Sequence, residues 1–258
     1  MHGVLNYSEI GMRAMQCERG KVLMRRLVLT IYVAMFPFLA VRGDESGGQQ
    51  TVQRMSNDKN GLQYLLYLPD NYGAQKRWPL VLFLHGSGER GDRIDRVKKH
   101  GPPKLVAAGE RFPFILVSPQ CPMDHRWDVR QLGSLLNQLE AKYKVDRDRI
   151  YVTGLSMGAT GTWALIASDP DRFAAIAPVC GRGDPETTKS FATTPTWVFH
   201  GAKDPTVPIS ESQRMVDALK VAGGKPKFTV YPNAKHDSWT AAYSSSEFYD
   251  WLLSQKRK

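Results

Sequence analysis

The sequence predicts an α/β fold in which a mostly parallel central sheet is flanked by helices. Short apolar runs alternate with segments of helical periodicity from residue 50 onward. The runs are four to seven residues long and almost wholly apolar, which is typical of strands buried on both faces of a parallel sheet. Most runs end at Gly or Pro, so loops follow at the carboxyl ends of the strands, where such sheets bind ligands.

Seven apolar runs are the predicted strands: residues 62–68, 80–84, 114–118, 150–153, 174–179, 196–200 and 228–231. Four segments with apolar residues at helical spacing are the predicted helices: residues 129–143, 157–168, 210–221 and 247–253. Their alternation predicts right-handed crossovers between parallel strands. No internal repeat or linker interrupts the pattern, so residues 44–258 are predicted to form one domain.

Residues 1–43 have the order of a secretory signal peptide. The basic segment KVLMRR precedes an uncharged, mainly apolar run of 15 residues at 27–41, and polar residues follow. This run is shorter than the about 20 apolar residues that span a membrane. We expect a secreted or periplasmic protein with no stable membrane span, cleaved near Ala40 or Gly43; a start at Met24 would give a leader of ordinary length. The alternative is a buried N-terminal helix or an anchor.

The charge pattern gives little support for a nucleic-acid partner. The net charge of +10 falls to +6 over residues 44–258, which hold 29 basic and 23 acidic residues. These charges are scattered along the chain, which favours solubility and differs from the basic patches that bind nucleic acid. The sequence leaves the oligomeric state open.

Two cysteines, Cys121 and Cys180, follow the expected leader. Export would permit a disulfide between them, and the alternative is two buried thiols; spacing alone does not decide. The sequence has no CxxC and no HExxH motif, so neither a metal site nor a cofactor is expected.

The motif GLSMG at 154–158 follows a predicted strand and opens a predicted helix. In this context GxSxG indicates a nucleophile elbow, a strained turn that points the serine hydroxyl out of the sheet. The flanking glycines let the strand and helix backbones approach closely. Ser156 is therefore the predicted nucleophile, and a purely structural turn is the alternative.

A serine hydroxyl is a poor nucleophile until a base takes its proton, and the base is expected after the last strand. His236 lies five residues after Tyr231, at the end of the last predicted strand, and is the predicted base. Asp204, after the strand at 196–200, is the predicted acid that orients it. Two other carboxylates are rivals for that role: Asp184 and Asp237. Two histidines at strand ends before glycine are expected to be structural: His85 and His200.

The chemistry also needs donors for a developing oxyanion. The backbone N–H of Met157, directly after the nucleophile, is one predicted donor. The second is expected from the glycine-rich loop HGSGERG at 85–91, where Ser87 is our choice. The charged residues of this loop are expected to form a local ion pair that holds it: Glu89, Arg90 and Asp92.

Six segments together carry a family resemblance: HGSGERG, PQCP, GLSMGATGTW, APVCGRGD, FHGAKDPTVP and YPNAKHDSW. They resemble the phospholipase/carboxylesterase-like group of the α/β-hydrolase superfamily, whose members are often labelled predicted peptidases. The group is similar to polyhydroxybutyrate depolymerases and to feruloyl and acetylxylan esterases. The resemblance covers residues 61–253 and implies the same roles for Ser156, Asp204 and His236. It leaves the substrate open.

Only 14 residues, 181–194, separate two predicted strands where many relatives insert a lid. Without a large lid, the site is expected to be open enough for a small or polymeric ester. Trp127 and Trp239 are the predicted aromatic wall for substrate, with core packing as the alternative. We expect a serine hydrolase that cleaves carboxylic esters through an acyl-enzyme. A serine peptidase of the same fold and a catalytically silent binding protein are the alternatives.

Overall fold

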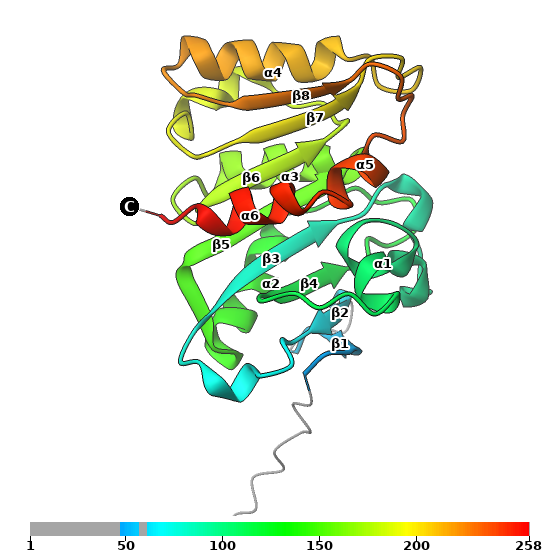
Figure 1. Ribbon diagram of the computed structural model, residues 1–258, viewed down its shortest axis with the longest axis vertical. Coiled ribbons are helices and arrows are strands. Elements are labelled where there is room, and N and C mark those ends of the chain that lie inside the picture. The colour runs from blue at the N-terminus through cyan, green and yellow to red at the C-terminus, as the bar shows by residue number, and fades with distance from the viewer. Residues whose placement is uncertain (1–46, 57–60, 258) are drawn as a thin grey trace, which may run out of the picture. The chain divides into compact units, whose positions relative to one another are not determined.

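An eight-stranded sheet runs through the computed structural model (Figure 1), which describes residues 47–56 and 61–257. The strands are β1 (Gln50–Arg54), β2 (Gln63–Tyr67), β3 (Trp78–Leu84), β4 (Ile115–Pro119), β5 (Val145–Leu155), β6 (Ala175–Val179), β7 (Trp197–Gly201) and β8 (Lys227–Tyr231). They lie in the order β1-β2-β4-β3-β5-β6-β7-β8. Only β2 runs antiparallel to its neighbours, and all other pairings are parallel.

Helices cover both faces of the sheet (Figure 1). One face carries α1 (Gly101–Ala107), α5 (Trp239–Tyr243) and α6 (Ser246–Ser254), and the other carries α2 (Val129–Lys142), α3 (Met157–Ser168) and α4 (Ser210–Val221). Single-turn or two-turn 3₁₀ segments lie in the connections: η1 (Tyr72–Ala74), η2 (Ser87–Glu89), η3 (Ile94–Lys99) and η4 (Pro185–Ser190). The sequence-based expectation of an α/β fold with a flanked, mostly parallel sheet is confirmed.

The core divides into two apolar clusters, one on each side of the sheet. Along β3, Leu80, Leu82 and Leu84 pack with α2, α3 and α4. The alternate residues Val81 and Phe83 pack with α1, α5 and α6. Successive side chains of a strand point to opposite faces, so a strand covered by helices on both faces must be apolar at every position.

Every predicted strand and helix is present, but the prediction missed three elements. Strand β1 has the polar sequence QTVQR and a largely exposed pattern, so no apolar run marks it. Helix α1 begins GPP, with Pro in its first turn, where the missing N–H costs nothing. Its seven residues, and the five of α5, are too few to establish a helical period.

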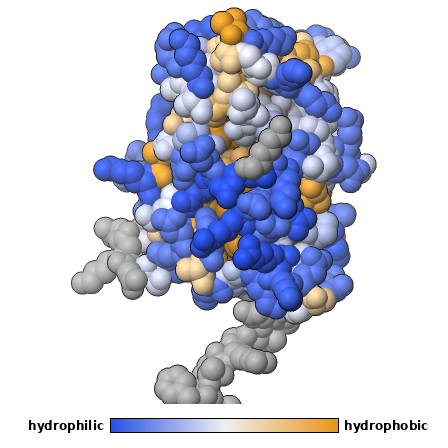
Figure 2. Space-filling model, turned by 90° about the vertical axis from the view of Figure 1, so that its left-hand side faces the viewer, coloured by the Kyte–Doolittle hydropathy of each residue, from blue (hydrophilic) through white to orange (hydrophobic). Residues whose placement is uncertain are grey.

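The carboxyl ends of β5, β6, β7 and β8 meet at one edge of the sheet, which gathers the loops that bear the predicted site residues. Figure 2 shows the opposite side, from which these strands start. Hydrophilic residues cover most of that side, and hydrophobic residues form small separate spots. This side shows no broad apolar surface, and the predicted site residues lie at the other edge.

The predicted leader, residues 1–43, lies outside the residues that the structure describes. Among residues 47–56 and 61–257, no helix has the length and apolar character needed to cross a membrane. Cys121 and Cys180 are both buried free thiols, so the disulfide that export would permit is not formed.

Candidate active site

Ser156 occupies the tight turn between β5 and α3. Its φ of 53° and ψ of −114° lie in a region that residues with a side chain rarely adopt. The Ser156 N–H donates to the carbonyl of Val179 at 2.9 Å, and its own carbonyl accepts the N–H of Thr160 at 3.1 Å. Hydrogen bonds to β6 and to α3 therefore hold the backbone in its strained form.

The two glycines of the motif are required by close backbone approach. A Cβ at Gly158 would overlap the carbonyl oxygen of Leu84 in β3. A Cβ at Gly154 would overlap the carbonyl group of Gly158 and approach the same Leu84 oxygen. The absence of both side chains lets α3 start directly against the sheet, which lifts the intervening serine above the sheet edge.

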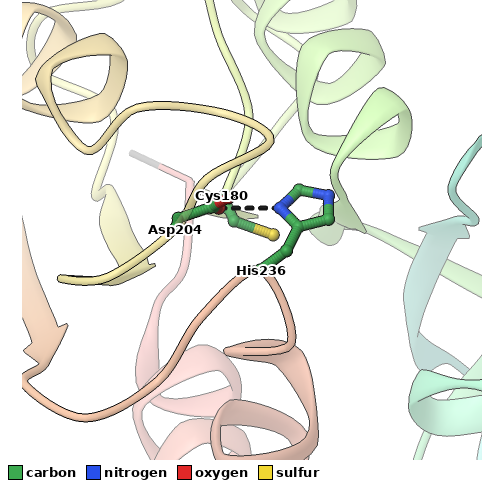
Figure 3. Close-up of side chains that lie close together, drawn as sticks. All are labelled: Cys180, Asp204 and His236. Atoms are coloured by element: carbon green, nitrogen blue, oxygen red, sulfur yellow. Dashed lines mark hydrogen bonds and ion pairs between the residues drawn. The ribbon is translucent and has the colours of Figure 1, made fainter.

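Ser156, His236 and Asp204 form one hydrogen-bonded chain. The Ser156 Oγ lies 2.9 Å from His236 Nε2, and His236 Nδ1 lies 2.7 Å from Asp204 Oδ2. Figure 3 shows the second of these bonds, with Asp204 on the loop after β7 and His236 on the loop after β8. The structure thus brings together three side chains that the sequence separates by 32 and 80 positions.

The Asp204 carboxylate is wholly buried and heavily hydrogen-bonded. Its Oδ1 accepts the N–H groups of Thr206 at 2.8 Å and Val207 at 3.0 Å. Burial raises the pKa of this carboxyl. The hydrogen bonds from His236, Val207 and Thr206 together lower the pKa by more than burial raises it, so the pKa lies below its ordinary value. The ionised carboxylate accepts a hydrogen bond from His236 Nδ1–H, which leaves Nε2 free to accept one from the Ser156 hydroxyl.

His200 lies fully buried beneath this carboxylate. Its Nδ1 is 2.7 Å from Ser212 Oγ, and its Nε2 is 2.9 Å from the Val207 carbonyl and 3.2 Å from Asp204 Oδ2. A neutral ring with its proton on Nε2 satisfies this arrangement, because Ser212 then donates to Nδ1. As expected from its place at a strand end, His200 hydrogen-bonds under the loop that carries the acid.

His85 has a similar structural place under the glycine-rich loop. Its Nδ1–H donates to the carbonyl of Gly86 at 2.6 Å, and its Nε2 accepts the N–H of Cys121 at 3.0 Å. Burial lowers the pKa of His85 to about 4, so the ring is neutral near pH 7. The ring joins the loop after β3 to the loop after β4.

The rival carboxylates are engaged elsewhere. Asp184 accepts the N–H of Glu186 at 3.1 Å and caps η4. Asp237 accepts the N–H and the hydroxyl of Thr240, both at 3.0 Å. Neither is bonded to His236, whose Nδ1 partner is Asp204.

Cys180, Asp204 and His236 place three potential metal ligands within 4.8 Å of one another (Figure 3). Their chemistry does not fit a metal site. Burial raises the pKa of the Cys180 thiol to about 12, so it stays protonated where a metal ligand must be a thiolate. The ligand atoms of Asp204 and His236 are already bonded to each other.

The two predicted oxyanion donors face the same cavity as Ser156. Met157 is the first residue of α3 and Ser87 the first of η2, positions whose N–H groups have no acceptor within their helix. The cavity has a volume of about 290 Å³, and nine residues line it: Ser87, Arg90, Arg126, Ser156, Met157, Thr160, Arg182, Thr206 and Val207. Ser87 and Met157 thus line the same cavity as Ser156, and their role as oxyanion donors stays a prediction.

Neither predicted tryptophan lines this cavity. Trp127 is 9% exposed; its Nε1 donates to the carbonyl of His85 at 3.2 Å, and its ring fills the space beside Gly161. Trp127 therefore packs in the core, which was the alternative to a role in the wall of the substrate site. Trp239 is half-buried, with its ring edge-on to His236 at 5.2 Å between centroids. A contact with substrate stays a prediction for Trp239.

The expected ion pair within the glycine-rich loop is absent. Arg90 instead donates to the carbonyls of Ser87 at 3.1 Å and His125 at 3.3 Å. Glu89 turns inward, and its carboxylate faces His100 at 3.7 Å. Glu89 is buried whereas Arg90 is partly exposed, and no ion pair joins the two side chains.

Comparison with known proteins supports the same fold and class. Residues 123–248 match the model of the dienelactone hydrolase family. A probable feruloyl esterase C from Aspergillus flavus is 23% identical over 211 residues, or 78% of each chain. A poly(3-hydroxyalkanoate) depolymerase C from Paucimonas lemoignei is 26% identical over 160 residues, covering 55% of this chain and 37% of that one. The crystal structure of a thermostable esterase is 30% identical with a TM-score of 0.70, and the match covers 81% of this chain and 63% of that one.

The layered sheet, the strained serine turn after β5 and these matches define the class: the chain has the α/β-hydrolase fold. Within that class it is an esterase-type hydrolase, as the sequence predicts.

Proposed function

We propose that the protein is a secreted or periplasmic serine esterase that cleaves carboxylic esters through an acyl-enzyme on Ser156. The observation that supports this most strongly is the hydrogen-bonded chain from the Ser156 hydroxyl through His236 to Asp204, with bonds of 2.9 Å and 2.7 Å. A serine at a strained turn, an imidazole hydrogen-bonded to its hydroxyl and a buried carboxylate are the parts that acyl transfer needs.

In the first half-reaction, Ser156 Oγ attacks the ester carbonyl carbon while its proton passes to His236 Nε2. Asp204 stabilises the resulting imidazolium through Nδ1–H. The negative carbonyl oxygen of the tetrahedral intermediate accepts the N–H groups of Met157 and Ser87, and one such donor is worth about 3–4 kcal/mol. The intermediate then collapses, the alcohol leaves with the proton from Nε2, and the acyl group remains on Ser156.

In the second half-reaction, water enters the cavity and gives a proton to His236 Nε2 as its oxygen attacks the acyl carbon. The same two N–H groups hold the oxyanion. Collapse releases the carboxylic acid and returns the proton to Ser156 Oγ. The cycle consumes one ester and one water, and it needs no cofactor.

The surroundings of the cavity favour an accessible ester, small or polymeric. The connection between β6 and β7 contains only η4, which packs against α4. Two similar proteins bear the names probable feruloyl esterase C and poly(3-hydroxyalkanoate) depolymerase C. We propose the same broad class of substrate, with residues 1–43 as a leader that is removed on export.

A fluorophosphonate probe and a substrate panel test this function. The folded protein should be labelled on Ser156 and should hydrolyse short p-nitrophenyl esters faster than peptides. Ser156→Ala should lose both properties, whereas the matched control Ser87→Ala should keep them because the Ser87 backbone N–H remains. No labelling of folded protein would favour a silent binding protein, and dominant peptide turnover would favour a peptidase.

A further inference from the structure

Three arginines line the cavity that contains Ser156: Arg90, Arg126 and Arg182. No Asp or Glu is among the residues that line it. The arginines come from three separate segments, which are the loop after β3, the approach to α2 and the loop after β6. A cleft with charges of one sign concentrates counter-ions from solution.

These guanidinium groups lack carboxylate partners within the described ranges. Arg90 uses its Nε and Nη1 on two backbone carbonyls. The side chains of Arg126 and Arg182 are exposed and form no hydrogen bond or ion pair in the part of the chain that the structure describes. By contrast, Arg149 and Arg172 away from the cavity bind carboxylates at 2.7 Å and 2.6 Å.

The backbone below the two unpaired arginines is fixed. Arg126 precedes Trp127, whose buried ring is held by His85. The N–H of Arg182 faces the hydroxyl of Thr160 at 3.4 Å, and Thr160 lies in the first turn of α3. Contacts of the backbone and of the neighbouring Trp127 therefore hold the chain at both positions, and mainly the arginine side chains must be ordered when a ligand binds.

We propose that the ester substrate carries a second, ionised carboxylate, which Arg126 and Arg182 bind with help from Arg90 while Ser156 attacks the ester carbonyl. A guanidinium offers two parallel N–H donors that match the two oxygens of a carboxylate. The cavity of about 290 Å³ suits a compact ester whose charged group lies a short chain away from the scissile bond. This inference rests on the proposed function and names its substrate class.

Matched pairs of esters test the proposal and show which side of the ester is charged. On the acyl side, p-nitrophenyl butyrate is compared with p-nitrophenyl hemisuccinate, in which a carboxylate replaces the terminal methyl. On the alcohol side, phenyl acetate is compared with 4-acetoxybenzoate. The wild-type full chain should prefer the charged member of at least one pair, and that preference should weaken as salt is added.

The variants Arg126→Gln and Arg182→Gln, alone and together, should remove the preference. The double variant should lower kcat/KM for the preferred anionic ester about 10- to 100-fold and leave its neutral counterpart nearly unchanged. Arg130→Gln is the matched control, because Arg130 is 92% exposed and does not line the cavity. Fluorophosphonate labelling of Ser156 in every variant shows that the site has remained folded.

A binding experiment separates this inference from the proposed function. Calorimetry with succinate and the Ser156→Ala full chain should show binding that the added Arg126→Gln and Arg182→Gln changes weaken at least tenfold. This result does not require turnover, so it holds or fails whether or not the protein is an esterase. The inference is overturned if the wild type shows no preference for either charged ester, or if the double variant keeps that preference. It is also overturned if succinate binds equally tightly with and without the two arginine substitutions.

Discussion

Asp204 and His200 meet beneath the candidate active site, with Asp204 Oδ2 lying 3.2 Å from His200 Nε2 and both side chains fully buried. The same carboxylate oxygen lies 2.7 Å from His236 Nδ1. The acid is therefore held from below by one histidine while it orients another. His200 is a positioning residue in this arrangement, since it acts through Asp204.

Replacing His200 should impair both folding stability and activity. In His200→Phe, Ser212 Oγ loses the nearer of its two partners, and Asp204 loses one of its supports, so we expect a loss of about 1–3 kcal/mol in the free energy of unfolding. We also expect a fall of roughly tenfold in kcat, because Asp204 is less firmly placed. Urea denaturation and ester turnover measure the two effects. Ser212→Ala is the control. Equal kcat values for His200→Phe and Ser212→Ala would show that His200 does not position Asp204.

Replacing the orienting acid should leave a folded but slow enzyme. Asp204→Asn keeps the shape of the side chain but favours the wrong tautomer of His236, so kcat should fall by about 10³- to 10⁴-fold. Asp184→Asn provides the comparison, because Asp184 only caps η4 and should leave kcat within a factor of about two. Steady-state kinetics of the two purified variants check this. A fast Asp204→Asn enzyme would mean that another group orients His236.

The pKa of His85 predicts a pH-dependent stability. Burial lowers this pKa from 6.5 to about 4 in the folded protein, so the unfolded chain binds the extra proton first as pH falls. The stabilising contribution of neutral His85 is complete above pH 6.5 and is lost as pH falls toward 4, by about 3 kcal/mol.

His85→Gln isolates this contribution, because an amide can donate to Gly86 and accept from Cys121 without titrating. The free energy of unfolding, measured by denaturant at pH 7 and pH 4.5, should therefore fall less in His85→Gln than in wild type. An equal fall in the free energy of unfolding between pH 7 and pH 4.5 in both proteins would show that His85 does not carry the pH dependence.

The elbow glycines should be intolerant of any side chain. Gly158→Ala places a methyl group on the carbonyl oxygen of Leu84, and we expect a loss of more than about 4 kcal/mol or no folded protein. Gly133→Ala in α2 is the matched control, because its Cβ would meet nothing within 4 Å and should stabilise the helix by about 0.5–1 kcal/mol. Thermal unfolding of both variants tests the pair; a stable Gly158→Ala protein would contradict the described elbow.

The strands of the central sheet and most of the helices that cover it could be predicted from the sequence, and so could the hydrogen-bonded trio of the candidate site. Ser156, Asp204 and His236 each follow a buried strand, and the fold requires those strand ends to meet at one edge. The polar edge strand β1 and the short helix α1 gave no periodic signal, because their stability comes from contacts made only in the folded chain.

The cavity wall was much less predictable. Arg126 and Arg182 carry no local motif, and only folding places them beside Ser156. Trp127 is adjacent to Arg126 in the sequence, yet its ring packs inward while Arg126 is exposed. Side chains that reach a cavity from exposed loops leave no hydrophobic period, so sequence reasoning finds the chemistry of this site more readily than its specificity.

The account depends on one chemical event, the transfer of an acyl group to Ser156 with His236 as base. Intact-protein and peptide mass spectrometry after rapid mixing with a p-nitrophenyl ester measures it directly. We predict a transient mass increase equal to the acyl group on the peptide that contains Ser156, and its loss in His236→Ala. Hydrolysis with no adduct at Ser156, or an adduct that forms equally fast without His236, would contradict the account.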